Sequence, residues 1–511
     1  MTLDEIVRRN ALRFPQQAAL QMDASLLNWQ QLDKRVNQLT NAFREKGLDK
    51  GDRVAILAAN CPEYFEIYFA CARAGLIAVP LNYRLTEKEL LEILTHASPK
   101  LFLIAAEFVP QARSVTEALD GLNDSWVVGE VEKTGFESYE NVLLNAPSIP
   151  AYSPADEKDC FAIFYTSGTT GLPKGEMVSH YNLEMNAYNQ MVADEATAND
   201  SNLISSPIYH MGAVFMAVTY MMLGCAQYIL HKFSPSEWLK LMQSCRCSVS
   251  LLIPTMINAI LNSEDFDEYD LASLRLVFYG GGPMPPAVLE KAISGLKCSF
   301  NQGYGLTETL EATFLLPEDH RMDGSEIKQK RLGSAGREAV GAEIRIVDEK
   351  GCDLKNNEVG EILIRSRSVI SAYWNMPEES ARVIKDGWFY TGDLGYLDED
   401  RYLFVVDRIK DLVISGGVNI YTREIESRLF QHPAILEAAI IGLADDEWGE
   451  IVTAVVVLHK NQAVSEQELI DFCAADMASY KKPKKVIYLD ELPKNPSGKV
   501  LKRELRLSLA V

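Results

Sequence analysis

The sequence predicts an α/β protein with a large N-terminal domain of parallel-rich sheets, a β-rich subdomain and a small α+β domain at the C-terminus. Three observations predict it. Short apolar runs alternate with helix-like segments before residue 280, closely spaced strands and turns follow from about residue 330, and a second mixed pattern begins after residue 408. The 511 residues, 47% hydrophobic and 24% charged, are typical of a globular chain of this size.

The first part of the chain supplies the strands of the predicted parallel sheets. Apolar runs without alternation are typical of strands that helices cover on both faces. A helical pattern at 64–74 separates the first two runs, and the apolar stretch 211–226 is too short to span a membrane and predicts a buried helix. The strand-like runs are residues 54–58, 78–80, 101–105, 161–165, 249–253 and 276–279.

The later segments predict two smaller units. Strands at 343–347, 360–365, 388–390 and 402–406, with a turn at 348–351, indicate the β-rich subdomain. The tail has helical patterns at 422–430 and 465–474 and strand-like runs at 438–441 and 453–458. We therefore expect an N-terminal domain over 1–407 and a C-terminal domain over 408–511.

Composition narrows the function classes. Lys and Arg number 50 against 71 Asp and Glu, and the formal net charge of −21 argues against general nucleic-acid binding. The N-terminal residues mix charges and contain no apolar signal core, so we expect a cytoplasmic protein without a transmembrane segment. Nine scattered cysteines lack the spacing of a zinc site and are expected to be reduced thiols.

The segment 165–175 concentrates hydroxyls, glycines and one lysine directly after an apolar strand. Glycines let a backbone approach phosphate oxygens, hydroxyls donate hydrogen bonds, and a lysine adds positive charge. A solvated turn would have a similar composition, and the familiar P-loop pattern is absent because Gly175 follows the lysine. The candidate phosphate-binding residues are Thr166, Ser167, Gly168, Thr169, Thr170 and Lys174.

This loop resembles the signature loop of the adenylate-forming enzymes, the family of acyl-CoA synthetases, luciferases and peptide-synthetase adenylation domains. Seven further motifs occur in the family's order, so the resemblance spans essentially the whole chain. They lie at 209–210, 280–283, 302–308, 390–393, 407–411, 415–417 and 493–499. The resemblance implies ATP and coenzyme A as substrates and Mg²⁺ as the metal cofactor.

The resemblance assigns ATP contacts to particular residues. Gly281, Gln302 and Gly303 would line the nucleotide site, and one short turn would carry Tyr304 near adenine, Thr307 at the α-phosphate and Glu308 at the metal. A hard divalent ion prefers a carboxylate together with phosphate oxygens, which fits Glu308. By the same resemblance, Asp393, after a Thr-Gly turn, accepts the ribose hydroxyls and Arg408 makes a second ribose or phosphate contact.

The catalytic and acyl-binding assignments follow in the same way. Lys499 would bridge the acid carboxylate and the α-phosphate, two anions that need a cation between them, and His210 would border the acid carboxylate. Few charges lie near the expected acyl pocket, which disfavours a dicarboxylate and favours a medium- or long-chain fatty acid or an aryl acid. The pocket candidates are His210, Met211, Gly212, Val214, Gly280, Gly305, Leu306 and Thr309.

The C-terminal part carries the expected coenzyme A path. Gly416 and Gly417 leave room for a pantetheine arm, and Trp448 resembles the family tryptophan beside it. A lysine cluster could attract the coenzyme's phosphates, although a solvated loop explains it equally. Its members are Lys481, Lys482, Lys484 and Lys485. The resemblance places a hinge at Lys410.

Two departures from the family pattern stand out. Glu176 occupies a position that is usually apolar, and Thr422 replaces a frequent proline. Neither removes a chemical group of the expected site, so the sequence predicts an ATP-dependent carboxylate:CoA ligase that works through an acyl-AMP. A free-standing enzyme that loads a carrier protein and a non-catalytic nucleotide-binding protein are the alternatives, and a homodimer is compatible with either.

Overall fold

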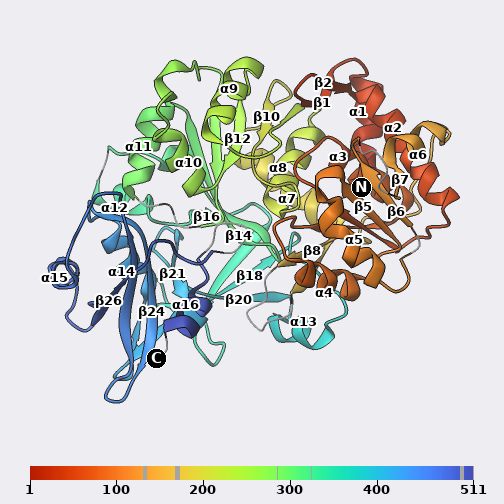
Figure 1. The fold of residues 1–511 in the computed structure, drawn as a ribbon. Helices are drawn as coiled ribbons and strands as arrows, with labels where there is room; N and C mark the ends of the chain where they lie inside the picture. Colours follow the sequence, from red (N-terminus) through yellow and green to blue (C-terminus); the bar gives the residue numbers. More distant parts are fainter. Residues whose placement is uncertain are drawn as a thin grey trace.

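The computed structural model describes residues 1–122, 124–130, 135–166, 173–282, 284, 286–323, 325–494 and 500–509. It confirms the α/β class, with two parallel-rich sheets, an antiparallel subdomain and a separate C-terminal sheet. In Figure 1 the C-terminal part, in blue, lies beside the cyan subdomain at one side of the larger N-terminal part. Within the described residues, no helix is long and apolar enough to cross a membrane.

The first sheet has seven strands and is parallel except at β8 and β9, which form an antiparallel hairpin. This edge hairpin brings both ends of the predicted phosphate loop to one place. From edge to edge the strands are β7 (Glu137–Ser138), β6 (Asp124–Val128), β5 (Leu101–Ala105), β3 (Arg53–Leu57), β4 (Ile77–Leu81), β8 (Cys160–Thr166) and β9 (Lys174–Ser179).

The second sheet has nine strands, parallel in its centre and antiparallel at both edges. Its β14 continues past the parallel core into the motif at 302–308, so part of the predicted ATP site is strand. In order the strands are β16 (Arg337–Glu338), β15 (Leu310–Leu315), β14 (Ser299–Leu306), β13 (Leu276–Tyr279), β12 (Val249–Leu252), β10 (Ser201–Ile204), β11 (Ala226–Ile229), β1 (Ala18–Met22) and β2 (Ser25–Asn28).

Helices fill the space between the two sheets and cover their outer faces. The central hydrophobic core joins both sheets through the helices α1 (Asp4–Arg13), α2 (Trp29–Glu45), α3 (Glu63–Ala74), α7 (His180–Ala193) and α8 (Met211–Met222). The first sheet is covered outside by α4 (Glu87–Ala97) and α5 (Val109–Ala118), and the second by α9 (Pro235–Cys245), α10 (Pro254–Leu261) and α11 (Pro286–Leu296). As the apolar stretch predicts, α8 is buried.

Helix ends follow local sequence signals. A capping box begins α4, where Thr86 accepts from the backbone of Glu89 and the Glu89 carboxylate accepts from Thr86. The same reciprocal pairing begins α7 at Ser179 and Asn182. Short elements complete this part: α6 (Tyr139–Asn145), α12 (Glu326–Arg331) and the 3-10 turns η1 (Ala106–Phe108), η2 (Phe266–Glu268) and η3 (Pro317–Asp319).

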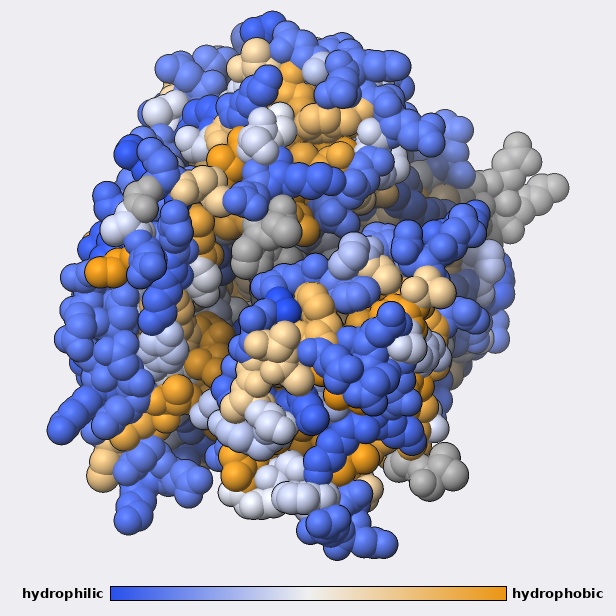
Figure 2. Space-filling model, turned by 90° about the vertical axis from the view of Figure 1, so that its left-hand side faces the viewer, coloured by the Kyte–Doolittle hydropathy of each residue, from blue (hydrophilic) through white to orange (hydrophobic). Residues whose placement is uncertain are grey.

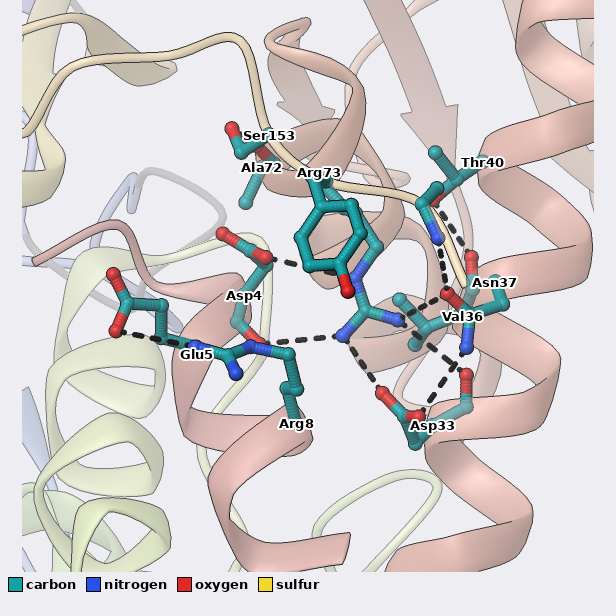
Figure 3. A network of polar contacts seen from close by, with 12 residues as sticks. Asp4, Glu5, Arg8, Asp33, Val36, Asn37, Thr40, Ala72, Arg73 and Ser153 are labelled. Carbon is teal, nitrogen blue, oxygen red and sulfur yellow. Dashed lines mark hydrogen bonds and ion pairs between the residues drawn. The ribbon is translucent and has the colours of Figure 1, made fainter. Parts of the chain in front are cut away.

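A buried arginine joins the first three long helices. Figure 3 shows Arg73 of α3 between Asp4 of α1 and Asp33 and Asn37 of α2. Its guanidinium donates to Asn37 Oδ1 at 2.9 Å and to Asp33 Oδ1 at 2.8 Å, and lies 3.5 Å from Asp4 Oδ2. Because a buried charge is costly unless it is paired, this network fixes the helices relative to one another.

The subdomain that follows is entirely antiparallel, with an apolar core of its own. Its long β20 pairs with β18 on one side and β21 on the other, and a short helix, α13 (Pro377–Val383), precedes β19. The strands are β17 (Ala342–Val347), β18 (Gly360–Ser366), β19 (Ile384–Lys385), β20 (Trp388–Leu397) and β21 (Leu403–Arg408).

The C-terminal sheet has helices on both faces. Apolar clusters pack one face against α14 (Thr422–Leu429) and α15 (Glu466–Ala474) and the other against α16 (Lys502–Leu509). The turn η4 (Ile409–Asp411) connects this sheet to β21. The strands of the C-terminal sheet are β23 (Val418–Ile420), β22 (Val413–Ser415), β25 (Gly449–Leu458), β24 (Ile435–Asp445) and β26 (Lys485–Tyr488). The boundary between the N-terminal and C-terminal domains, placed after residue 407, stays a prediction.

Figure 2 shows the face of the molecule that lies at the left of Figure 1. Hydrophilic side chains cover most of it, and apolar side chains form separate small patches. This distribution is ordinary for the surface of a globular protein, because single apolar side chains are common there.

Candidate active site

The β8–β9 hairpin presents the two ends of the predicted phosphate loop. Thr166 and Lys174 are opposite each other in the ladder, while Ser167, Gly168, Thr169 and Thr170 lie outside the described residues. The Lys174 ammonium forms an ion pair of 2.6 Å with Glu379 of α13 and lies 5.0 Å from the centre of the Tyr373 ring. The lysine is therefore held by the subdomain.

Glu176, one of the two departures, is fully buried in the same hairpin. The Thr166 hydroxyl donates to its Oε1, and its Oε2 has no hydrogen-bond partner among the described residues. Burial, and next to it the nearby Glu308 charge, hold the pKa of the Glu176 carboxyl well above its usual value. Two carboxyl groups therefore share one region, and a cation between them would relieve their repulsion.

The sequence predicted one short turn for the motif from Gly303 to Glu308, and that prediction is wrong. Tyr304 lies within β14, and Thr307 and Glu308 lie in the turn that joins β14 to β15. The Tyr373 hydroxyl donates to Glu308 Oε1 at 2.8 Å, and the Ile370 amide donates to the Glu308 carbonyl. Strand β14 extends to Leu306 because Leu306 pairs with Leu310 of β15 in a hairpin. The motif alone does not indicate this pairing.

Asp393 is also in a strand and not simply after a turn, since it lies within β20 opposite Arg408 of β21. It is 2% exposed, and the Tyr304 hydroxyl donates to its Oδ2 at 2.9 Å. Arg408 Nε lies 3.0 Å from Oδ1 as an ion pair, yet outside hydrogen-bond geometry, so Oδ1 has no donor among the described residues. A buried acceptor without a donor fits a ribose hydroxyl.

The other predicted nucleotide contacts lie around these side chains. Gly281 is exposed just beyond β13 in the left-handed conformation, and Gln302 and Gly303 precede Tyr304 in β14. Burial and the Asp393 charge raise the pKa of the Tyr304 phenol well above its usual value, so it stays a hydrogen-bond donor. The motifs from the large sheet and from the subdomain therefore meet at one place.

His210 begins α8 as its N-cap residue and is half-buried. Burial lowers the pKa of its imidazole to about 4, so the ring is neutral at pH 7, and Nε2 has no partner among the described residues. A neutral imidazole can donate to or accept from a substrate oxygen without adding charge.

The predicted acyl-pocket residues divide into two groups. Gly212, Gly280, Gly305 and Leu306 are half-buried, whereas Met211, Val214 and Thr309 are buried. The Thr309 hydroxyl accepts from the Leu306 amide and donates to the Leu310 carbonyl, so its side chain closes the turn. A Cβ on Gly280 would lie 2.9 Å from the Gly303 carbonyl oxygen, which requires glycine there.

The predicted coenzyme A residues do come together. Gly416 and Gly417 form the two-residue turn between β22 and β23, with φ of +60° and +78°, as such hairpins require. The Gly416 amide donates to the Trp448 carbonyl at 2.8 Å, and a Cβ there would lie 2.9 Å from the Trp448 ring. The Lys484 ammonium lies 3.6 Å from the centre of that half-exposed ring.

Lys410, the predicted hinge residue, is exposed in η4, between β21 and the C-terminal sheet. Across it, the Thr422 amide and hydroxyl both donate to the buried Asp407 carboxylate, the hydroxyl at 2.9 Å. Proline in place of Thr422 would lack both donors. Lys499 lies outside the described residues.

Sequence reasoning missed Tyr373 and Glu379, which hold Glu308 and Lys174. Neither belongs to a motif, and each lies more than 60 residues from its partner, so no local signal could have found them. For the metal, the described residues contain no group of three or more His, Cys, Asp or Glu side chains that could hold an ion. Glu308 still fits Mg²⁺, which usually takes one or two carboxylates together with substrate phosphates and water.

Comparisons with known proteins show which family the chain belongs to. Family models for the AMP-binding enzymes and for their C-terminal domain match residues 7–374 and 424–499. A fatty acid–[acyl-carrier-protein] ligase of Streptomyces coeruleorubidus is 33% identical over 99% of this chain and 96% of its own, and a feruloyl-CoA synthase of an Amycolatopsis species is 34% identical over 98% and 97%. ATP-bound MatB from Rhodopseudomonas palustris superposes with a TM-score of 0.88 at 31% identity, covering 99% of both chains. This chain therefore belongs to the AMP-binding, adenylate-forming enzyme family.

Proposed function

We propose that this protein is an ATP-dependent carboxylate:CoA ligase that forms an acyl-CoA through an acyl-AMP. The observation that carries the proposal is the arrangement around Asp393. Its carboxylate is buried, held by Tyr304 and Arg408, and retains an acceptor without a donor. That arrangement suits a ribose, and Glu308 lies in the turn that follows β14, the strand of Tyr304.

The first step joins the acid to AMP. An oxygen of the acid carboxylate attacks the α-phosphorus of ATP, the bond to the β-phosphate oxygen breaks, and pyrophosphate leaves. Thr307 would donate to the α-phosphate, Glu308 would hold Mg²⁺, and Lys499 would neutralise the two anions as they approach. The metal, when bound, offsets the charge that develops on the leaving pyrophosphate.

The second step transfers the acyl group to the thiol of coenzyme A. The thiolate attacks the acyl carbonyl, and the carbonyl–phosphate bond breaks to release AMP. Gly416, Gly417 and Trp448 support a path for the pantetheine arm, and Lys484 supports a phosphate contact beside it. Both steps use one site, so the C-terminal domain would turn about Lys410 between them.

The acid is a medium- or long-chain fatty acid or an aryl acid in this proposal. At the half-buried candidate Gly212 a Cβ would meet only Leu251, at 3.6 Å, and feruloyl-CoA synthase and a fatty acid ligase are among the relatives. Because one relative is a carrier-protein ligase, the carrier-protein acceptor stays the alternative. Cytoplasmic location and homodimerisation stay predictions.

The experiment measures pyrophosphate release with a panel of fatty and aryl acids, first with ATP and Mg²⁺ alone and then with coenzyme A or a carrier protein bearing a phosphopantetheine arm. We expect acid-dependent release and thioester formation on coenzyme A. No release with any acid would refute adenylation, and a thioester only on the carrier protein would support the alternative.

A further inference from the structure

A band of buried and half-buried polar side chains lies between α7 and two strands of the nine-stranded sheet, β14 and β15. Its four members are Asn186 and Gln190 of α7, Asn301 of β14 and Glu311 of β15. Both α7 residues are fully buried, and five polar atoms of the band have no hydrogen-bond partner among the described residues. They are Asn186 Nδ2, Gln190 Oε1 and Nε2, Asn301 Oδ1 and Glu311 Oε2. Native interiors pair the great majority of such atoms, so this concentration points to a missing polar partner.

Contacts show how Glu311 joins this band. Its backbone amide donates to Asn186 Oδ1 at 3.0 Å, which leaves the Asn186 amide group without an acceptor. Gln190 lies one helical turn further along the same face of α7. The Glu311 carboxyl occupies the space that a side chain at Gly303 would fill, so the glycine makes room for it.

The backbone of Glu311 lies next to a predicted acyl-binding residue, Gly305. Glu311 is opposite Gly305 in the β14–β15 ladder, and the Gly303 carbonyl lies against Gly280. Unlike Asn186, Glu311 is only half-buried, as Gly280 and Gly305 are. Part of the Glu311 side chain is therefore accessible, while Oε2 is enclosed.

The chemistry of the band selects a ligand group. Burial, with a smaller effect of the Asp194 charge, raises the pKa of the Glu311 carboxyl to about 8, so it carries a proton at neutral pH. It then offers one donor and one acceptor, and Asn186 adds an N–H donor. A hydroxyl group both accepts and donates, so it can pair with both residues, whereas a methyl or methylene group would leave them unpaired.

We propose that Glu311 and Asn186 form a hydroxyl-binding subsite in the acyl pocket, and that the preferred acid carries a hydroxyl group remote from its carboxylate. The inference rests on the proposed function and names the substrate class for that site. A pocket with buried polar groups strongly rejects an analogue that lacks the matching hydroxyl, since its own groups are then left unpaired.

The test compares acids in matched pairs that differ only in the hydroxyl: cinnamic with 4-hydroxycinnamic acid, and octanoic with 8-hydroxyoctanoic acid. The ratio of kcat/KM within a pair is the measured quantity. We expect the wild type to prefer the hydroxylated member of at least one pair by tenfold or more. The Glu311→Leu variant should reduce that ratio below about three, and Glu311→Gln, which keeps a donor and an acceptor, should retain most of it.

The control is Glu318→Leu, which removes an exposed carboxylate outside the band and should leave the ratio unchanged. Melting temperatures show whether the variants fold; if Glu311→Leu does not, Asn186→Leu is measured in the same way. Wild-type ratios below tenfold in both pairs, or equal losses for both members of a pair in Glu311→Leu, would each overturn the inference. Absence of pyrophosphate release with every acid would instead refute the proposed function.

Discussion

Replacing Asp393 with asparagine tests the ribose site with a minimal change of shape. The side chain is 2% exposed and accepts from Tyr304 at 2.9 Å, so the variant retains its place and loses its charge. Hydrogen bonds to a charged group contribute about 1.5–3 kcal/mol, and neutral ones about 0.5–1.5 kcal/mol. If one ribose bond is lost and the other becomes neutral, ATP binding weakens by about 2.5–4.5 kcal/mol, or roughly 70- to 2,000-fold.

The assay is pyrophosphate release at saturating acid, with ATP and its 2′-deoxy and 3′-deoxy analogues as matched substrates. The wild type should lose kcat/KM on at least one deoxy analogue, and Asp393→Asn should show a much smaller difference between ATP and that analogue, because the two changes remove the same bond. Tyr304→Phe, which removes only the supporting hydroxyl, should cost about tenfold or less. Equal discrimination in wild type and Asp393→Asn, or a loss for ATP below threefold, would refute the reasoning.

Four further predictions concern other parts of the account. Lys499→Ala should reduce acyl-AMP formation by at least 1,000-fold, about 4 kcal/mol, while thioester formation from supplied acyl-AMP continues; single-turnover assays separate the two. Lys410→Pro should slow thioester formation far more than pyrophosphate release, because proline fixes φ at the hinge; equal losses would contradict the turn between steps. Gly212→Leu, where a Cβ would meet Leu251 at an ordinary 3.6 Å, should lower kcat/KM most for the longest acid, by about 10- to 100-fold, and least for acetate. The Glu311 carboxyl has a pKa of about 8 in the folded state against an ordinary 4.5, so between these pH values the native state holds a proton that the unfolded state releases. Its contribution to the free energy of unfolding is therefore full below pH 4.5 and falls by up to about 1.4 kcal/mol per pH unit towards pH 8. Urea unfolding at a series of pH values should show that Glu311→Gln lacks this slope.

The sequence alone was enough to predict most of the fold. Apolar runs without alternation predict strands such as β3, β5 and β13, and the apolar stretch at α8 predicts a buried helix, because burial on two faces leaves a direct mark on composition. The places of Tyr304 and Asp393 could not be predicted in the same way. Glycine-rich motifs indicate turns, but pairing with neighbouring strands extends β14 and β20 through them.

The residues that sequence reasoning missed depend on long-range contacts. Tyr373 reaches Glu308 across 65 positions, so only the folded chain brings them together. The sequence did contain a signal for the polar band. On one face of α7 the amide side chains of Asn182, Asn186, Asn189 and Gln190 recur, whereas the buried face of a helix is expected to be apolar. Glu311, the single charged residue in the mostly apolar strand β15, completes that signal.

The most direct measurement of the central claim follows the carboxylate oxygen. An acid labelled with ¹⁸O in its carboxylate is converted with ATP, Mg²⁺ and coenzyme A, and the products are analysed by mass spectrometry. Attack on the α-phosphorus followed by thiolysis of the carbonyl predicts one ¹⁸O atom in AMP and none in pyrophosphate. Unlabelled AMP alongside acyl-CoA, or label in free phosphate, would contradict the acyl-AMP pathway.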